Sequence, residues 1–333
     1  MKLKPLSEQT IVIMGASSGI GLATAREAAR RGARLVLMAR SEDALLALQN
    51  EMDELGAQVV VVCGDVGNLQ DVRRAALMAV ESFGGFDTWI NIAGVSIFGE
   101  LMKVPLEDHR KLFETNYWGV VHGSQVAVEH LRNEGGALIT VGSVVSDRAI
   151  PLQGSYSASK AAVKGYTDAL RMELEHERLP ISVTLIQPAS INTGFPGHAK
   201  NYMDKEPRLA PPVYAPQLVA ESILQCAEKP TRQVLVGDGA AALSWMGALV
   251  PGLTDLFMDR SMFTQQQRPE SAKSRRDNLG QATEDLREEG NHNGPVFRNT
   301  VSGSTGRLPL AYAGLALAGI SAAVLWKRQR RTA

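Results

Sequence analysis

Residues 10–32 read TIVIMGASSGIGLATAREAARRG, and this stretch decides the fold class. It begins with a β-rich apolar run, continues through Gly15, Gly19 and Gly21 in a GxxxGxG spacing, and ends in an alanine- and arginine-rich helical pattern. Gly32 follows the helical pattern as a C-cap. The stretch therefore predicts a strand, a tight turn and a helix in direct succession.

Further apolar runs continue this pattern. Between Thr10 and about Gly237 they alternate with longer helical stretches, which predicts βαβ units. Most runs are apolar on successive residues, as expected for a parallel sheet that helices cover on both faces. We predict an α/β fold in which residues 7–237 form a Rossmann-type, doubly wound parallel sheet of about seven strands. The runs after the first are RLVLMAR, QVVVVCG, DTWINIAG, ALITVGS, ISVTLIQP and QVLVG.

The composition of the 333-residue chain excludes several functional classes. Its 35 basic and 35 acidic residues cancel to a formal net charge of +0, so no overall field attracts nucleic-acid phosphates. The two cysteines, Cys63 and Cys226, exclude a disulfide scaffold and a CxxC metal motif, and the 6 histidines are scattered. We therefore expect no nucleic-acid partner and no metal site.

The three glycines of the turn occupy the positions where a dinucleotide needs them. Gly15 permits the tight turn, Gly19 lets a pyrophosphate approach the backbone, and Gly21 brings the helix onto the sheet. The N-terminus of the helix then faces the anion. A merely structural glycine turn is the alternative, but the strand before it and the helix after it favour a phosphate site.

Arg40 indicates which dinucleotide is bound. The second apolar run ends in Ala39 and Arg40, without the Asp or Glu that accepts hydrogen bonds from an NAD ribose. A guanidinium pairs instead with a 2′-phosphate, and Ser17 in the glycine turn can add a hydroxyl donor. We therefore expect NADP(H) in preference to NAD(H). The alternative is that Arg40 only begins the next helix, beside Glu42 and Asp43.

Tyr156 and Lys160 lie four residues apart and so share one face of a helix, and Ser143 precedes them at the end of a strand. An adjacent ammonium favours phenolate, so we expect the pKa of Tyr156 to move from about 10 toward neutral pH. Tyr156 is then a candidate proton donor and acceptor. Ser143 would hold the substrate oxygen, and Lys160 would bond the nicotinamide ribose.

With these motifs in place, the chain resembles the classical short-chain dehydrogenases/reductases from about Ser7 to Gly237. The resemblance implies the strand order 3-2-1-4-5-6-7 for the sheet. It makes Asn116 the anchor of a proton-relay water. It also implies a homo-oligomer, a dimer or tetramer built on the helices that contain Asn116 and Tyr156.

The resemblance adds cofactor contacts to the site. Asp65 and Val66 resemble the pair that contacts adenine, Asn91–Gly94 resembles the NNAG segment under the cofactor, and Pro188–Thr193 resembles the stretch that meets the nicotinamide carboxamide. The expected catalytic residues are Asn116, Ser143, Tyr156 and Lys160. The expected cofactor-binding residues are Gly15, Ser17, Ser18, Gly19, Ile20, Gly21, Arg40, Asp65, Val66, Asn91, Ala93, Gly94, Tyr156, Lys160, Pro188 and Thr193.

Three positions depart from the pattern of the family that the chain resembles. Met14 replaces the usual threonine before the glycine turn, Ile92 the second asparagine, and Ala189 the glycine after Pro188. None of these changes removes an atom used in proton or hydride transfer. Loss of the hydroxyl at Met14 could loosen the glycine turn.

The composition changes twice beyond Gly237. Residues 238–265 are largely apolar and are broken by Pro251 and Gly252, which predicts two short helices. This apolar helical extension could cover a cavity, lie against a bilayer or pack on the sheet edge. Residues 266–307 hold only seven apolar residues among 42, with charges of both signs, and we predict a disordered linker there.

A membrane anchor is predicted next. Residues 308–326 are nineteen residues without a charge, and the basic tail 327–333 follows directly. A helix of this length spans about 28 Å, close to the roughly 30 Å of hydrocarbon in a bilayer, so this is a candidate transmembrane helix.

The orientation of this helix is ambiguous. Four basic residues in the tail favour a cytoplasmic C-terminus, whereas the apolar run Ile11–Met14 is far too short for a signal peptide and leaves the N-terminal domain in the cytoplasm. A simple single span cannot satisfy both, so either the tail crosses or the helix lies in the interface. We expect a membrane-associated protein whose catalytic domain faces the cytoplasm.

These residues favour an NADP(H)-dependent oxidoreductase that interconverts a ketone or aldehyde and its alcohol. A lid-like loop after Thr193 carries Phe195, Tyr202 and Met203, which indicates an apolar cavity and a lipophilic substrate. The alternative from another class is a membrane-tethered, non-catalytic NADP(H)-binding sensor or scaffold. Epimerisation or dehydration of a sugar nucleotide on the same fold is a third, minor alternative.

Overall fold

Seven parallel strands form the central sheet of the computed structural model, which describes residues 2–282 and 286–300. Their order across the sheet is β12-β7-β6-β4-β1-β2-β3, so the order 3-2-1-4-5-6-7 is confirmed when only these strands are counted. The strands are β1 (Thr10–Met14), β2 (Arg34–Ala39), β3 (Val59–Cys63), β4 (Thr88–Asn91), β6 (Gly136–Val141), β7 (Ile181–Pro188) and β12 (Gln233–Val236).

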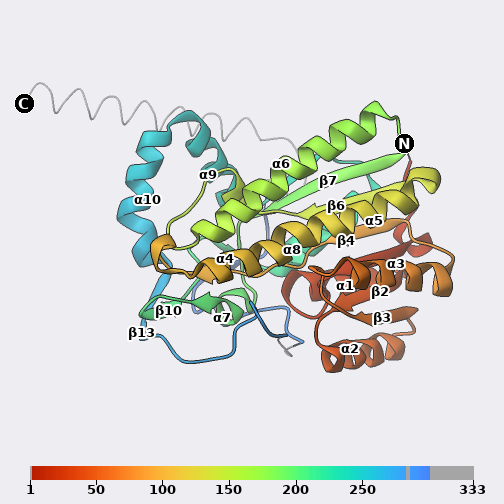
Figure 1. The fold of residues 1–333 in the computed structure, drawn as a ribbon, viewed down its shortest axis with the longest axis horizontal. Helices are drawn as coiled ribbons and strands as arrows, with labels where there is room; N and C mark the ends of the chain where they lie inside the picture. Colours follow the sequence, from red (N-terminus) through yellow and green to blue (C-terminus); the bar gives the residue numbers. More distant parts are fainter. Residues whose placement is uncertain (1, 283–285, 301–333) are drawn as a thin grey trace, which may run out of the picture.

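Helices cover both faces of this sheet, which is the doubly wound arrangement (Figure 1). On one face lie α1 (Gly19–Arg30), α2 (Glu42–Glu54) and α8 (Pro216–Glu228), and on the other lie α3 (Leu69–Phe83), α5 (Gly119–Glu134) and α6 (Gly154–His176).

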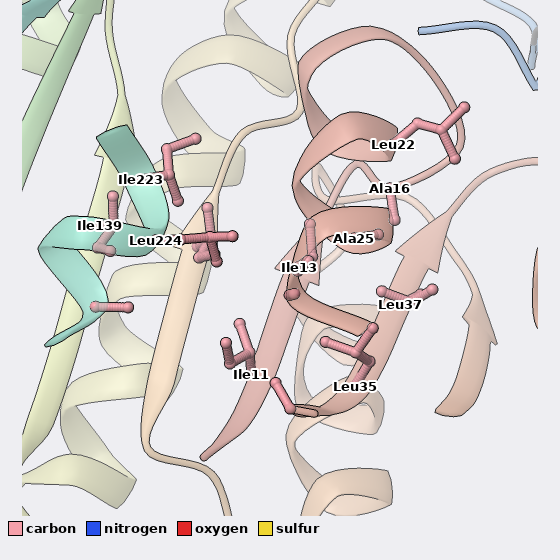
Figure 2. Close-up of a cluster of buried hydrophobic side chains, with 14 of the residues drawn as sticks. Ile11, Ile13, Ala16, Leu22, Ala25, Leu35, Leu37, Ile139, Ile223 and Leu224 are labelled. Carbon is pink, nitrogen blue, oxygen red and sulfur yellow. The ribbon is translucent and has the colours of Figure 1, made fainter. Parts of the chain in front are cut away.

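The successive apolar residues of the strands explain this burial. Ile11 and Ile13 of β1 point to the face that α1 and α8 cover (Figure 2), whereas Val12 and Met14 point to the opposite face. All four side chains are at most 1% exposed. Because each such side chain contributes about 1.5–3 kcal/mol when it is buried, both faces stabilise the same register.

Polar residues and glycines mark the helix ends. Ser41 caps α2 by accepting a hydrogen bond from the Ala44 amide at 3.3 Å. Gly32 and Gly84 follow α1 and α3 in the left-handed conformation, with φ of 79° and 80°. Gly32 thus ends the turn before β2, and Gly84 lies in the turn before β4.

Most of the short elements follow the carboxyl ends of the central strands, whereas η1 (Leu6–Glu8) precedes β1. The short strands form three small sheets, β5-β9, β10-β13 and β14-β11-β8. The elements are η1 (Leu6–Glu8), β5 (Ile97–Phe98), η2 (Leu101–Lys103), α4 (Leu106–Phe113), the π-helical turn η3 (Glu114–Trp118), η4 (Val144–Ser146), β8 (Ser190–Ile191), α7 (Phe195–His198), β9 (Lys200–Asn201), β10 (Lys205–Pro207), β11 (Val213–Tyr214), α9 (Asp238–Leu249), α10 (Pro251–Gln265), β13 (Gln267–Ser271) and β14 (Val296–Phe297).

The two short helices expected after the sheet are α9 and α10, which meet at Pro251. The extension packs beside the segment that follows β6, because Ser244 donates a hydrogen bond to the Asp147 carboxylate at 2.6 Å. Figure 1 shows α9 and α10 at the opposite end of the molecule from α2 and β3. On α10, Leu253 and Phe257 are 50% and 46% exposed.

The expectation of a disordered linker over 266–307 is wrong for several parts of the described range. Residues 267–271 form β13 against β10, Val296–Phe297 pair with β11, and Leu279 is only 6% exposed. Composition fails here because the segment is held by backbone pairing and a few side chains that bind partners far away in the sequence.

The candidate transmembrane helix lies outside the described residues, as do residues 301–307 and the basic tail. Within residues 2–282 and 286–300, every helix is too short or too polar to cross a bilayer.

Candidate active site

A cavity of about 260 Å³ opens at the carboxyl ends of the central strands. This is the edge at which open α/β sheets bind ligands. All the predicted site residues line it except Asn91 and Asn116. Those in the wall are Gly15, Ser17, Ser18, Gly19, Ile20, Gly21, Arg40, Asp65, Val66, Ala93, Gly94, Ser143, Tyr156, Lys160, Pro188 and Thr193.

The glycine turn forms a cradle that side chains would fill. Gly15 has φ of 109°, in the left-handed region, and a Cβ on Gly21 would lie 1.9 Å from the Gly15 carbonyl oxygen. A Cβ on Gly19 would meet the Thr193 side chain at 3.1 Å. The first N–H groups of α1 have no acceptor within the helix, so the cradle presents donors to an anion and fits a dinucleotide pyrophosphate.

Arg40 stands at the end of β2 and also lines the cavity. Its Nη2 donates a hydrogen bond to the carbonyl oxygen of Asn278 at 2.7 Å. Ser17 and Ser41 lie in the same wall, which gives this end of the cavity one guanidinium and two hydroxyls. Such a donor set suits a phosphate ester.

The two asparagines outside the cavity wall have structural partners. Asn91 accepts a hydrogen bond from Trp89 Nε1 at 2.9 Å and donates one to Ser124 at 3.2 Å. The side chain of Asn116, in the π-helical turn, accepts from the Val95 amide at 2.8 Å and donates to the Val95 carbonyl at 3.0 Å. Asn116 therefore holds the loop after β4 in place.

Asn116 nevertheless lies close to the predicted catalytic group. A Cβ on Gly94 would be 3.5 Å from Asn116 Oδ1 and 3.8 Å from Lys160 Nζ. The π-helical turn at Asn116 is also an element that occurs often at functional sites. Its role as the anchor of a relay water stays a prediction.

Helix α6 and strand β6 bring Ser143, Tyr156 and Lys160 together. Lys160 Nζ donates a hydrogen bond to the Val141 carbonyl at 2.8 Å and lies 5.8 Å from the centre of the Tyr156 ring. The Ser143 side chain hydrogen-bonds the Tyr156 hydroxyl. Tyr156 and Lys160 share one face of α6, and Ser143 follows the end of β6, so the three side chains form one cluster, as the sequence predicts.

The expected effect of Lys160 on Tyr156 is wrong for this structure. Burial raises the pKa of Tyr156 to about 12, and only the Ser143 hydrogen bond opposes it. Burial also lowers the pKa of Lys160 to about 8. Desolvation dominates because Lys160 is buried and Tyr156 is partly buried in the cavity wall, so that their charged forms lose hydration. Tyr156 is therefore a neutral phenol near pH 7.

The end of the cavity beyond Tyr156 is mostly apolar. Phe195 packs against the Tyr156 ring with the two ring centres 5.5 Å apart. Tyr202 lies outside the cavity wall, where its hydroxyl donates to the Asp108 carboxylate at 2.5 Å, and Met203 is also outside it. Ile191, within the predicted stretch Pro188–Thr193, also lines this end of the cavity. The sequence did not single out the other wall residues here, which are Val95, Phe98, Val144, Val145, Ile150, Gln153, His198 and Leu209.

Some of these residues follow predicted motifs directly. Val95 comes after Gly94, and Val144 comes after Ser143, so their place in the chain could have indicated them. Asn278 and Ala282 also line the cavity but carry no such signal, since they lie in the segment expected to be disordered.

A family profile described as short chain dehydrogenase matches residues 9–202. The chain belongs to the short-chain dehydrogenase family. It is therefore an oxidoreductase of this family with a site for a small-molecule substrate, and its reaction is consistent with interconversion of CH–OH and C=O.

Two related proteins illustrate the range of this short-chain dehydrogenase family. The uncharacterized oxidoreductase YxnA of Bacillus subtilis is 48% identical over 269 residues, covering 80% of this chain and 76% of that protein. The 11-beta-hydroxysteroid dehydrogenase-like 4A of Arabidopsis thaliana is 33% identical over 257 residues, covering 74% and 82%.

Solved structures share the fold and carry nicotinamide cofactors. A short-chain dehydrogenase from Burkholderia phymatum in complex with NAD has a TM-score of 0.68 at 24% identity, covering 82% of this chain and 100% of that one. The L-sorbose reductase of Gluconobacter frateurii, complexed with NADPH and L-sorbose, has a TM-score of 0.60 at 25% identity, covering 68% and 94%. The first of these two proteins is in complex with NAD and the second with NADPH.

Proposed function

We propose that this short-chain dehydrogenase is NADP(H)-dependent and interconverts a lipophilic ketone or aldehyde with its alcohol. The position of Tyr156, Ser143 and Lys160 carries this proposal. They lie between the glycine cradle on one side and a mostly apolar pocket on the other. A carbonyl in that pocket would reach both a proton donor and the place where the cofactor binds.

Tyr156, Ser143 and Lys160 have different roles in the proposed reaction. The bound nicotinamide supplies the hydride in reduction and accepts it in oxidation. Tyr156, protonated because burial raises its pKa to about 12, donates a proton to the carbonyl oxygen in reduction. Ser143 hydrogen-bonds the same oxygen and so orients it, while Lys160 lies within reach of the cofactor ribose.

Arg40 and Ser17 support the preference for NADP(H). They would hold the 2′-phosphate, and β2 ends without a carboxylate that would repel it. The lipophilic substrate is supported by the apolar wall beyond Tyr156 and by relatives whose names describe them as 11-beta-hydroxysteroid dehydrogenase-like.

Membrane attachment through residues 308–326 is part of the proposal, with the catalytic domain on the cytoplasmic side. The uncharged sequence of that segment and the exposed Leu253 and Phe257 of α10 support it. Co-sedimentation with anionic liposomes tests it. Leu317→Arg should release the protein, Ser304→Arg should not, and equal sedimentation of both variants would contradict attachment by this segment.

The test of the activity is consumption of NADPH with a panel of lipophilic aldehydes and ketones. We expect turnover of at least one carbonyl, with slower turnover when NADH replaces NADPH. Tight NADPH binding without oxidation across the whole panel would favour the alternative, a non-catalytic sensor or scaffold.

A further inference from the structure

Two described stretches of the C-terminal segment, residues 277–282 and 286–290, lie across the cavity; we call them the strap. Its backbone carbonyls occupy donors of the dinucleotide site. The Gly19 amide donates a hydrogen bond to the Arg287 carbonyl at 2.9 Å, and Arg40 Nη2 donates to the Asn278 carbonyl at 2.7 Å.

These contacts compete with the cofactor at two places. A peptide N–H has one hydrogen to donate, so Gly19 cannot serve both the Arg287 carbonyl and a pyrophosphate oxygen well. The Asn278 carbonyl likewise takes part of the Arg40 guanidinium that would hold the 2′-phosphate. The remaining cavity of about 260 Å³ is smaller than the roughly 300–1,000 Å³ usual for ligand sites.

The strap is held by anchors that lie outside the dinucleotide site. Glu288 accepts hydrogen bonds from Arg26 at 2.9 Å and from Gln217 at 2.7 Å. Leu279 is buried in the small core around Val95. These contacts fix both described stretches to the domain.

The closed arrangement leaves polar atoms unsatisfied. The Oδ1 atoms of Asn278 and Asn192 are buried and have no hydrogen-bond partner among the described residues. Asn278 is 7% exposed and lines the cavity. A buried polar atom without a hydrogen-bond partner costs free energy, so these two atoms destabilise the closed arrangement of the strap.

We propose that the strap is an intramolecular competitor of the dinucleotide, which must be displaced before NADP(H) occupies the glycine cradle and Arg40. This inference rests on the proposed function. Apparent cofactor affinity is then reduced by the fraction of molecules in the closed arrangement, and weakening the strap raises it.

The first test changes the anchor and spares the dinucleotide site in the full-length protein. Glu288→Ala removes the contacts to Arg26 and Gln217, while Arg26 keeps its ion pair with Glu51. NADPH binding, followed by fluorescence titration, should tighten by about fivefold. Glu289→Ala is the matched control, because Glu289 pairs only with exposed Arg298 among the described residues. Its affinity should stay within about twofold of wild type.

A second pair of variants tests the strap by adding a methyl group that clashes with the protein at one position and not at the other. A Cβ on Gly290 would lie 2.2 Å from the Thr193 carbonyl oxygen, whereas a Cβ on Gly280 would meet nothing within 4 Å. Gly290→Ala should push the strap away and tighten NADPH binding, and Gly280→Ala should leave it unchanged. Weaker NADPH binding in both Glu288→Ala and Gly290→Ala, or affinities equal to those of their controls, would overturn the proposal.

Amide hydrogen exchange provides a readout independent of turnover. The Asn278 amide donates to the His198 carbonyl at 2.7 Å and the Gly290 amide to the Asn192 carbonyl at 3.2 Å. Saturating NADPH should accelerate exchange at both, but not at Ala272, whose amide donates to Asp204. Protection of both amides would show a lid that closes over the cofactor and would overturn the proposal. If neither wild type nor any of the four variants bound a nicotinamide nucleotide, the proposed function would be refuted, and the strap proposal with it.

Discussion

The Tyr156 hydroxyl is the group on which turnover should depend most. Tyr156→Phe removes the proton donor but keeps a ring that can pack against Phe195. We expect kcat for carbonyl reduction to fall by about 10²–10⁴-fold with NADPH affinity unchanged. Single-turnover kinetics beside an NADPH titration measures both. A variant as active as wild type would contradict the assigned role.

Lys160 should make folding stability depend on pH. Burial lowers its pKa from 10.5 to about 8, so between these values the unfolded chain binds more protons than the folded one. The contribution of Lys160 to stability therefore rises as pH increases from 8 to 10. Relative to Lys160→Met, wild type should gain about 2–3 kcal/mol over that interval. Urea unfolding at pH 7, 8 and 10 checks this, and a constant difference would contradict it.

Arg40 should determine the preference for NADPH over NADH. Arg40→Ala removes a charged donor that NADPH can use through its 2′-phosphate and that NADH cannot. We expect NADPH affinity to fall by about 10–100-fold and NADH affinity to change much less. Titration with both nucleotides measures the ratio, and equal losses would show that Arg40 does not select the phosphate.

Local spacing was enough to predict that the turn glycines, Ser143, Tyr156 and Lys160 meet at the site, but it did not predict the pKa of Tyr156. The turn glycines, Ser143, Tyr156 and Lys160 lie at strand ends or on one helix face, so short-range geometry places them. The pKa of Tyr156 depends instead on burial by segments that pack together only in the fold. The contact between Asn278 and Arg40 could not be predicted for the same reason, because the two residues are 238 positions apart in the sequence.

The junction of β1 and α1 depends on the absence of a side chain at Gly21. A Cβ there would lie 1.9 Å from the Gly15 carbonyl oxygen, so Gly21→Ala must push the helix off the sheet. We expect the free energy of unfolding to drop by about 3 kcal/mol. Gly252→Ala in α10 is the control, because its Cβ meets nothing within 4 Å and a gain of about 0.5–1 kcal/mol is expected. Equal effects in denaturant unfolding would contradict this account.

Elements buried on both sides were the most predictable part of the fold. After their first residues, Thr10 and Arg34, the runs of β1 and β2 are apolar, and their assignment as strands follows from that pattern. The order of the strands, in contrast, was predicted from the family resemblance. The segment after α10 was not predictable, because β13 and β14 pair with short strands of the lid region and not with neighbours in sequence. Few apolar residues are needed when the backbone supplies the contacts.

The assembled protein is expected to be a dimer or tetramer through α5 and α6. Ala161, Gly165 and Ala169 all lie on the exposed face of α6, and a Cβ on Gly165 would meet nothing within 4 Å. Gly165→Arg should shift the protein to the monomer in sedimentation analysis, and Gly252→Arg should not. Retention of the oligomer by Gly165→Arg would place the interface elsewhere.

The position of the strap along the chain matters during synthesis. The sheet is complete at Val236, so the glycine cradle and Arg40 are synthesised before residue 277. Domains fold as units while translation proceeds at about 5–20 residues per second. A dinucleotide that binds at that stage meets a cradle that the strap does not yet occupy. The strap carbonyls of Asn278 and Arg287, which are made later, are then kept from Arg40 and Gly19 by the bound cofactor.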